Sequence, residues 1–238
     1  MGTWDGLFCT DEDIAIEASN DWPLLFAEPI LAIGRDGAVA AASPWVLASP
    51  SNDFEAQGVA PGHLCFLSDL GDVADGAVPY RDQLLAVAAV AGSIMTLRPL
   101  GSSGGGVPPG LLGDLASVRF QVSTARPRID RATDSIARHL QFRGLGPSVA
   151  GLDLRRACVL KVLCQRCRDL SRLIVSEERS QWAEKARMYC EAADAELGAV
   201  LASQASRPAR ARPAFGIQED DFTGRPREFW EKGGNLGW

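Results

Sequence analysis

Residues 153–174 read DLRRACVLKVLCQRCRDLSRLI, and the order of apolar and polar side chains in this stretch decides half of the fold. Asp153 is a preferred helix N-cap residue. The apolar side chains after it are spaced by 3, 4, 3 and 4 residues, at Leu160, Leu163, Cys167, Leu170 and Ile174. This spacing places them along one side of an α-helix. The stretch therefore predicts an amphipathic helix over 153–174 that packs through this stripe.

The segments on either side of this stretch predict two more helices. Ser176 is the N-cap of a helix that continues to about Ser203, and the short turn before it makes the two helices an antiparallel pair. A helix over 127–141 comes earlier and ends before Gly144, Gly146 and Pro147. The apolar stripe of the last helix consists of Trp182, Ala186, Tyr189, Ala193, Leu197 and Val200.

The N-terminal half changes to short apolar runs separated by turn residues, which is typical of β-strands. Arg35-Asp36-Gly37 predicts one hairpin, and Gly92 predicts another between strands at 83–91 and 93–97. Strands are also predicted at 63–67 and 118–122, and a short acidic helix capped by Thr10 precedes the region. The predicted fold class is α+β: a small antiparallel β sheet or barrel, then an α-helical bundle, then an extended C-terminal tail.

Charge divides the chain at the same boundary. Residues 1–120 hold fifteen acidic and four basic side chains, a net of −11, and residues 121–238 hold fifteen acidic and twenty basic ones, a net of +5, which sum to −6. We predict an acidic β-rich domain over 1–124, a basic three-helix bundle over 125–204, and a Pro/Arg linker with an aromatic tail over 205–238. The overall pI of about 5.0 argues against a dedicated nucleic-acid-binding protein.

The C-terminal tail carries the strongest functional signal. Prolines and arginines at 206–213 predict an extended linker. Aromatic side chains follow it, beyond the end of the predicted core: Phe222, Phe229, Trp230 and Trp238. Each aromatic side chain buries roughly 150–250 Å² when it docks. We predict that they bind a partner or the next copy of the chain; folding back on the parent domain is the alternative.

Arginine is concentrated at the start of the helical half, at Arg126, Arg128, Arg131 and Arg138. Three interpretations are open for these side chains. They form the solvated faces of amphipathic helices, or they contact acidic faces of neighbouring copies, or they line a path for DNA. Contact with phosphates would be independent of sequence and sensitive to salt.

Residue patterns for chemistry are weak, and we predict no catalytic residues, no metal site and no cofactor. Cys164-Gln165-Arg166-Cys167 is a CxxC motif inside a predicted helix without a second pair for zinc, so we expect it to pack in the core. His63 and His139 have no nucleophile tied to them. Acidic clusters at 11–13 and 69–75 are expected to be solvated, and the glycine-rich run 101–106 lacks the residues of a phosphate loop.

We expect a soluble protein made in the cytoplasm, because the N-terminus lacks a signal peptide and no apolar run approaches the roughly 20 residues that span a bilayer. The cysteines stand at positions 9, 65, 158, 164, 167 and 190. In that compartment we expect all six to be reduced, buried thiols.

The helical half and its tail resemble the adaptor, or head-completion, proteins of the neck of tailed bacteriophages. The resemblance rests on the Arg-rich helix that begins at Pro127-Arg128-Ile129-Asp130-Arg131-Ala132, on the helix pair joined near Ser176 with Ser180–Tyr189 opening the last helix, and on the C-terminal extension. The turn Gly58-Val59-Ala60-Pro61-Gly62 is similar to turns of phage structural proteins. About half of the chain is covered.

This resemblance implies a non-enzymatic virion protein at the head-to-tail interface. It would form a ring of copies, a dodecamer as in the family, that docks on the portal protein and connects it to the next neck or tail protein. It implies that the tail aromatics anchor the ring on the portal, that some arginines contact packaged DNA, and that no membrane is involved. The alternative is a DNA-binding regulatory protein with an acidic sensor domain and a basic helical reader.

Overall fold

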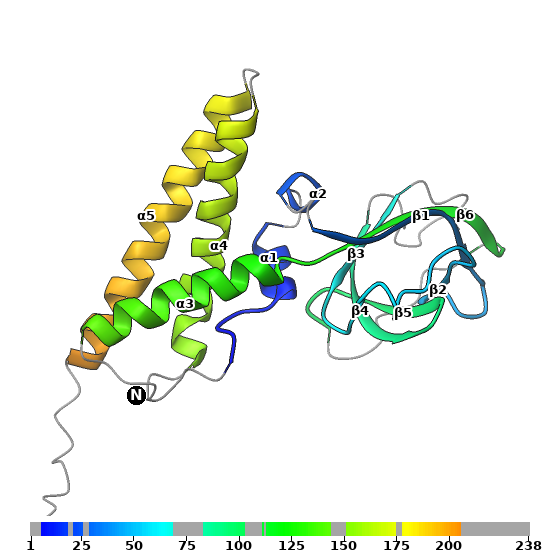
Figure 1. Cartoon of the computed structure of the whole chain (residues 1–238), viewed down its shortest axis with the longest axis horizontal. Helices are drawn as coiled ribbons and strands as arrows, with labels where there is room; N and C mark the ends of the chain where they lie inside the picture. Colours follow the sequence, from blue (N-terminus) through cyan, green and yellow to red (C-terminus); the bar gives the residue numbers. More distant parts are fainter. Residues whose placement is uncertain are drawn as a thin grey trace, which may run out of the picture. The chain divides into compact units, whose positions relative to one another are not determined.

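The computed structural model describes residues 6–18, 21–25, 29–68, 83–102, 111, 113–143, 151–174 and 178–205. They form an α+β protein with a closed antiparallel barrel and helices, as predicted (Figure 1). The strands are β1 (Ile30–Val39), β2 (Val46–Ala48), β3 (Leu64–Ser68), β4 (Gln83–Ala91), β5 (Ile94–Pro99) and β6 (Leu115–Ser123). The helices are α1 (Asp11–Glu17), α2 (Trp22–Leu25), α3 (Arg126–Phe142), α4 (Gly151–Leu173) and α5 (Glu178–Ala205).

The described residues up to Val200 form one compact unit, and Leu201–Ala205 at the end of α5 fall outside it. The predicted domain boundaries at 124 and 204 stay predictions. The tail aromatics Phe222, Phe229, Trp230 and Trp238 lie outside the described residues.

The barrel closes in the order β1-β2-β5-β4-β3-β6, with every neighbouring pair antiparallel. Closure gives each strand a paired neighbour on both sides, although β1 and β2 pair only at Ala38–Ala48 and Val39–Leu47. A closed sheet offers fewer strand edges to sheets of other molecules. Alternate residues of the strands point inward and form one apolar core, as the period of two predicts. Phe54 from a connecting turn enters this core, and its ring meets Phe120 edge-on at 5.5 Å between centroids.

The hairpin predicted at Arg35-Asp36-Gly37 is wrong, because β1 runs through these residues as one strand. Its register against β6 shifts between Gly34 and Gly37, so the Asp-Gly pair marks a bulge instead of a turn. Both glycines are required there: a Cβ on Gly34 would lie 2.5 Å from the Phe120 ring, and one on Gly37 would lie 2.8 Å from a backbone oxygen of β6.

The predicted hairpin around Gly92 is confirmed. β4 and β5 pair along their length, and Gly92 between them has a φ of 56°, in the left-handed region that glycine adopts without strain. The predicted strands at 63–67 and 118–122 correspond to β3 and to part of β6.

The predicted helices are confirmed within a few residues at each end. α4 begins at Gly151, two residues before the predicted N-cap Asp153, and the predicted cap Ser176 of α5 lies outside the described residues. The stripe of α5 is buried apart from Tyr189, which is half-buried. α4 is buried far beyond its predicted stripe, because α1, α2 and α3 also pack against it. Its further buried side chains include Leu154, Ala157, Cys158, Val159, Val162 and Arg166.

The expectation of six reduced cysteines is wrong for two of them. Cys164 of α4 and Cys190 of α5 form a disulfide, with 5.0 Å between their Cα atoms, where the two helices lie side by side (Figure 1). Cys190 stands beside the apolar stripe of α5, and the antiparallel pairing of the helices brings it opposite Cys164. The other cysteines are free and buried: Cys9, Cys65, Cys158 and Cys167. Core packing of the second CxxC cysteine is therefore confirmed.

Candidate functional site: helix α1 and its cleft with α4

Helix α1 is short, yet its first turn connects three other parts of the molecule. Thr10 caps it: the Thr10 Oγ1 accepts from the Asp13 amide, and the Asp13 carboxylate accepts from the Thr10 amide at 2.9 Å. This reciprocal capping box fixes where the helix starts. It also sets the directions of three consecutive carboxylates, Asp11, Glu12 and Asp13, which were expected to be solvated. Each of them has a different partner.

Asp11 holds the junction between β6 and α3. Its carboxylate accepts from the Thr124 hydroxyl at 2.6 Å and from the Ala125 amide at 2.8 Å. Thr124 Oγ1 in turn accepts from the Arg126 amide at 3.0 Å, so the two side chains together cap the start of α3. Asp11 is only 5% exposed, and burial raises its pKa to about 6, although both hydrogen bonds oppose the rise.

Glu12 binds the barrel through Arg98 of β5. The two groups form a bidentate pair, with N···O distances of 2.7 and 2.6 Å. The Gly101 amide also donates to Glu12 at 2.7 Å, and Arg98 donates to the Ser102 carbonyl at 2.7 Å. The hydrogen bonds from Arg98 hold the pKa of Glu12 below its ordinary value. A planar bidentate pair fixes direction as well as distance, so this contact orients α1 on the barrel.

Asp13 binds α4 through an ion pair with Arg155. The next residue, Arg156, pairs with Glu196 of α5 at 3.1 Å, so adjacent arginines of α4 join α4 to a helix on either side. The three carboxylates of α1 thus contact the β6–α3 junction, the barrel and α4 in turn.

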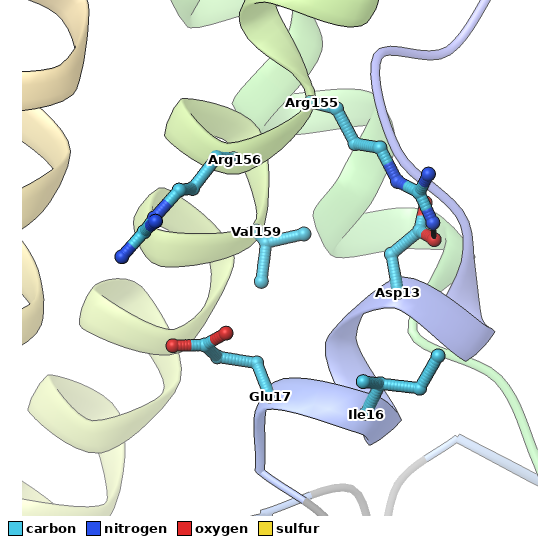
Figure 2. A pocket seen from close by; sticks show the side chains of 6 residues that line it. All are labelled: Asp13, Ile16, Glu17, Arg155, Arg156 and Val159. Atoms are coloured by element: carbon cyan, nitrogen blue, oxygen red, sulfur yellow. Dashed lines mark hydrogen bonds and ion pairs between the residues drawn. The ribbon is translucent and has the colours of Figure 1, made fainter. Parts of the chain in front are cut away.

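The ion pairs border an open cleft of about 230 Å³ between α1 and α4. Figure 2 shows Arg155 turned toward Asp13 at one end and Arg156 on the opposite side. Ile16 lines the cleft and is 52% exposed, whereas Val159 is buried. Glu17 also lines it, and in the described part of the chain its carboxylate has no ion-pair partner. The cleft therefore offers one carboxylate without an ion-pair partner among the described residues, beside an exposed apolar side chain, which suits a contact with a polar or cationic group.

A pair of buried thiols lies near α1. Cys9 Sγ is 3.1 Å from Cys158 Sγ of α4, and the Thr133 hydroxyl of α3 is 3.8 Å from the same sulfur. The hydrogen bond that Cys9 donates to Cys158, together with burial, raises the pKa of Cys9 well above its ordinary value, and the same hydrogen bond lowers the pKa of Cys158. Cys9 is therefore a protonated thiol that donates to Cys158, and the two side chains pack the N-terminal segment against α3 and α4.

The four arginines predicted for inter-subunit or DNA contacts have different surroundings. Arg128 is committed within the chain, because its guanidinium binds Asp169 of α4 at 2.7 Å. Arg126 pairs with Asp130 at 3.0 Å on the surface of α3. Arg131 and Arg138 are exposed on the same helix, and Arg138 donates to the Asp134 carbonyl at 3.2 Å. The exposed face of α3 thus presents three of the four, interspersed with aspartates.

His63 has a local role in the structure. Its Nδ1 accepts from the Ala60 amide at 3.0 Å, which closes the Pro-Gly turn before β3. In the described ranges, no group of three or more His, Cys, Asp or Glu side chains is placed to hold a metal ion. None of the described helices is long and apolar enough to cross a membrane.

No family model, curated protein or solved structure matches the chain.

Sequence reasoning identified the cap of α1 but missed the partners of its carboxylates. Arg98 is 86 residues from Glu12, and Arg155 is 142 residues from Asp13. A run of acidic residues at a helix start is explained locally by the capping box and by the helix dipole. Nothing in that local pattern distinguishes solvated carboxylates from carboxylates with distant partners.

Proposed function

We propose that this chain is a structural protein of the phage head-to-tail interface. In this role it forms an adaptor ring that docks on the portal protein and connects it to the next neck or tail component. The observation that carries the proposal is the set of three consecutive α1 carboxylates. They attach the barrel, α3 and α4 to one short helix. A protein that holds two partners at a fixed position relative to each other needs such internal connections.

The exposed face of α3 supports lateral contact between copies. Arg131 and Arg138 are exposed and would meet the acidic half of a neighbouring copy, whose first 120 residues carry a net of −11. Such a head-to-tail contact between unlike surfaces generates rings when the rotation closes. The tail aromatics would then anchor each copy on the portal, as large side chains in central pockets do.

The regulatory alternative has weaker support. Arg128 is occupied by Asp169, and Asp130 and Asp134 interrupt the remaining cations of α3. Acidic side chains within a cationic face lower its affinity for phosphates, because each repels the DNA backbone. The outcome with DNA nevertheless belongs in the test.

The experiment measures absolute mass by light scattering, for the full chain alone and with a candidate portal protein. We expect a 25.4 kDa species that joins the portal in a complex of fixed stoichiometry. A Phe229→Ser, Trp230→Ser variant should lose the complex, and Phe142→Ser, which replaces an aromatic that is 90% exposed on α3, should keep it. A chain indifferent to the portal but shifted by duplex DNA at low salt would overturn the adaptor proposal.

A further inference from the structure

The disulfide between α4 and α5 lies at the surface on one side. Cys164 is 8% exposed, whereas Cys190 is half-buried and lines an open groove of about 370 Å³ between the two helices. An incoming thiol therefore has access to the Cys190 sulfur. This sets the Cys164–Cys190 bond apart from Cys9 and Cys158, whose side chains are buried.

A cation lies directly against the Cys190 sulfur. The Arg168 guanidinium is 3.2 Å from Cys190 Sγ, and Arg168 also lines the groove. Thiol–disulfide exchange begins with a thiolate anion, and its negative charge spreads over the attacking, central and leaving sulfurs. A guanidinium at this position attracts the anion and stabilises that charge. Arg168 would therefore accelerate exchange at Cys190.

The neighbouring free thiol does not compete for this bond. Cys167 lies one helical turn after Cys164, but it is fully buried and burial raises its pKa to about 11. It therefore stays a protonated thiol, which is a poor nucleophile.

From these contacts we propose that Cys190 is a thiol-exchange site, and that the Cys164–Cys190 bond is a reversible redox switch controlling how firmly α5 is held on α4. The co-reactant is a low-molecular-weight thiol of the glutathione class. Its thiolate attacks Cys190 Sγ and forms a mixed disulfide, while Cys164 leaves and takes up a proton. A second thiol then attacks the mixed disulfide and releases Cys190. The protein disulfide gains two electrons and two protons, and the two small thiols become one small disulfide.

This proposal goes beyond the adaptor function and does not depend on it. The sequence predicts synthesis in the cytoplasm, where disulfides that do form are usually transient or redox-sensing. The disulfide closes a span of 26 residues between α4 and α5. After reduction, α5 keeps its apolar stripe, the Lys185–Asp21 ion pair at 2.5 Å and the Arg156–Glu196 pair. We expect α5 to loosen without leaving the fold.

The test begins with the native full chain, oxidised and treated with reduced glutathione. Alkylation and mass spectrometry follow each cysteine over time. We expect Cys164 and Cys190 to become alkylated after mild reduction, while Cys9, Cys65, Cys158 and Cys167 stay protected until the protein is denatured. A glutathione adduct should appear on Cys190 before Cys164 is alkylated. A bond that is reduced only in denaturant, or six thiols that react alike before reduction, would overturn the proposal.

Two arginine variants separate the role of Arg168 from a general charge effect. Arg168→Met should slow reduction roughly threefold to fivefold, because it removes the charge beside the reacting sulfurs. Arg172→Met is the matched control, since it removes an exposed arginine one turn further along α4, and its rate should match that of the unmodified chain. Equal rates for the two variants would remove Arg168 from the proposal.

Hydrogen exchange tests whether reduction changes the hold on α5. Amides of 178–205 should exchange at least several-fold faster after reduction, while those of α3 should not change. Cys190→Ser should show the fast pattern with or without thiol, which separates loss of the bond from any other effect of the reductant. Unchanged exchange in α5 after reduction would contradict the switch.

Discussion

Replacing Asp11 with asparagine tests the unusual burial of a carboxylate at the junction of the barrel and α3. Asp11→Asn keeps the shape of the side chain: its Oδ1 can accept from the Ala125 amide, and its amide can donate to Thr124 Oγ1. The substitution removes the charge and reverses the direction of the hydrogen bond with Thr124. Asp11 in the native chain has a pKa of about 6, raised by burial from 3.8. The difference of about two units corresponds to about 3 kcal/mol between the charged and neutral forms in the folded state.

The sign of the pH dependence follows from the raised pKa. Between pH 3.8 and about 6 the folded chain binds this proton and the unfolded chain does not, so the group stabilises the fold as pH falls. We compare the free energy of unfolding of the native chain with that of Asp11→Asn. Relative to pH 8, this difference should shift in favour of the native chain by about 1.4 kcal/mol at pH 5 and about 2.4 kcal/mol at pH 4. At pH 8 the variant should be at least as stable as the native chain, because it buries no charge.

The assay is urea unfolding followed by tryptophan fluorescence from pH 4 to 8 at constant ionic strength. Asp130→Asn is the control, because its carboxylate is half exposed in a surface pair, and its effect should stay within about 0.5 kcal/mol at every pH. Asp11→Ala should cost about 1–3 kcal/mol at low pH, since it leaves the Thr124 and Ala125 donors unpaired. The reasoning is refuted if the free energy of unfolding of the native chain, relative to Asp11→Asn, does not change with pH or increases toward pH 8. The hydrogen bonds to Asp11 would then outweigh its burial.

Further predictions concern the other connections in the molecule. Glu12→Gln should cost about 1 kcal/mol at neutral pH after allowance for partial exposure. Because Arg98 holds the pKa of Glu12 low, the cost should shrink as the pH falls from the ordinary glutamate pKa through the lowered pKa of the folded chain, and urea unfolding at pH 3 and 7 measures the change. Gly34→Ala should destabilise the barrel by about 1–3 kcal/mol, because its Cβ would overlap the Phe120 ring. Gly198→Ala should instead stabilise α5 by up to about 1 kcal/mol, because nothing lies within 4 Å of its Cβ position. Thermal unfolding should therefore show a lower melting temperature for the first variant and a higher one for the second. Reduction of the Cys164–Cys190 bond should cost up to about 3.5 kcal/mol by the loop-entropy relation for its 26-residue separation, and unfolding midpoints with and without reductant give the loss.

The internal connections explain why substitutions near α1 should act on more than one element. Glu12 contacts the barrel and Asp13 contacts α4, and the two residues are adjacent. A change that shifts the start of α1, such as Thr10→Ala, disturbs the directions of all three carboxylates together. Effects of single substitutions in this turn should therefore not add, as is usual for groups that share one network.

The sequence by itself determined the elements whose signals are local. The stripes of α4 and α5, the Thr10 cap and the turn at Gly92 follow from side-chain spacing and backbone preference over a few residues. The same local rules failed at Asp36-Gly37, because a bulge and a hairpin turn use the same residue types. Only the β1–β6 register, with Phe120 against Gly34, decides between them.

Tertiary structure alone decided which groups meet across the chain. It placed Cys190 opposite Cys164, closed six strands into a barrel, and gave each carboxylate of α1 a separate partner. The disulfide and the contacts of the α1 carboxylates join residues from 26 to 142 positions apart. They depend on how helices and strands pack, since periodicity shows which face of an element is buried but not which element covers it. Burial then changed the chemistry as well, because the same carboxylate is acidic in water and has a raised pKa at the β6–α3 junction.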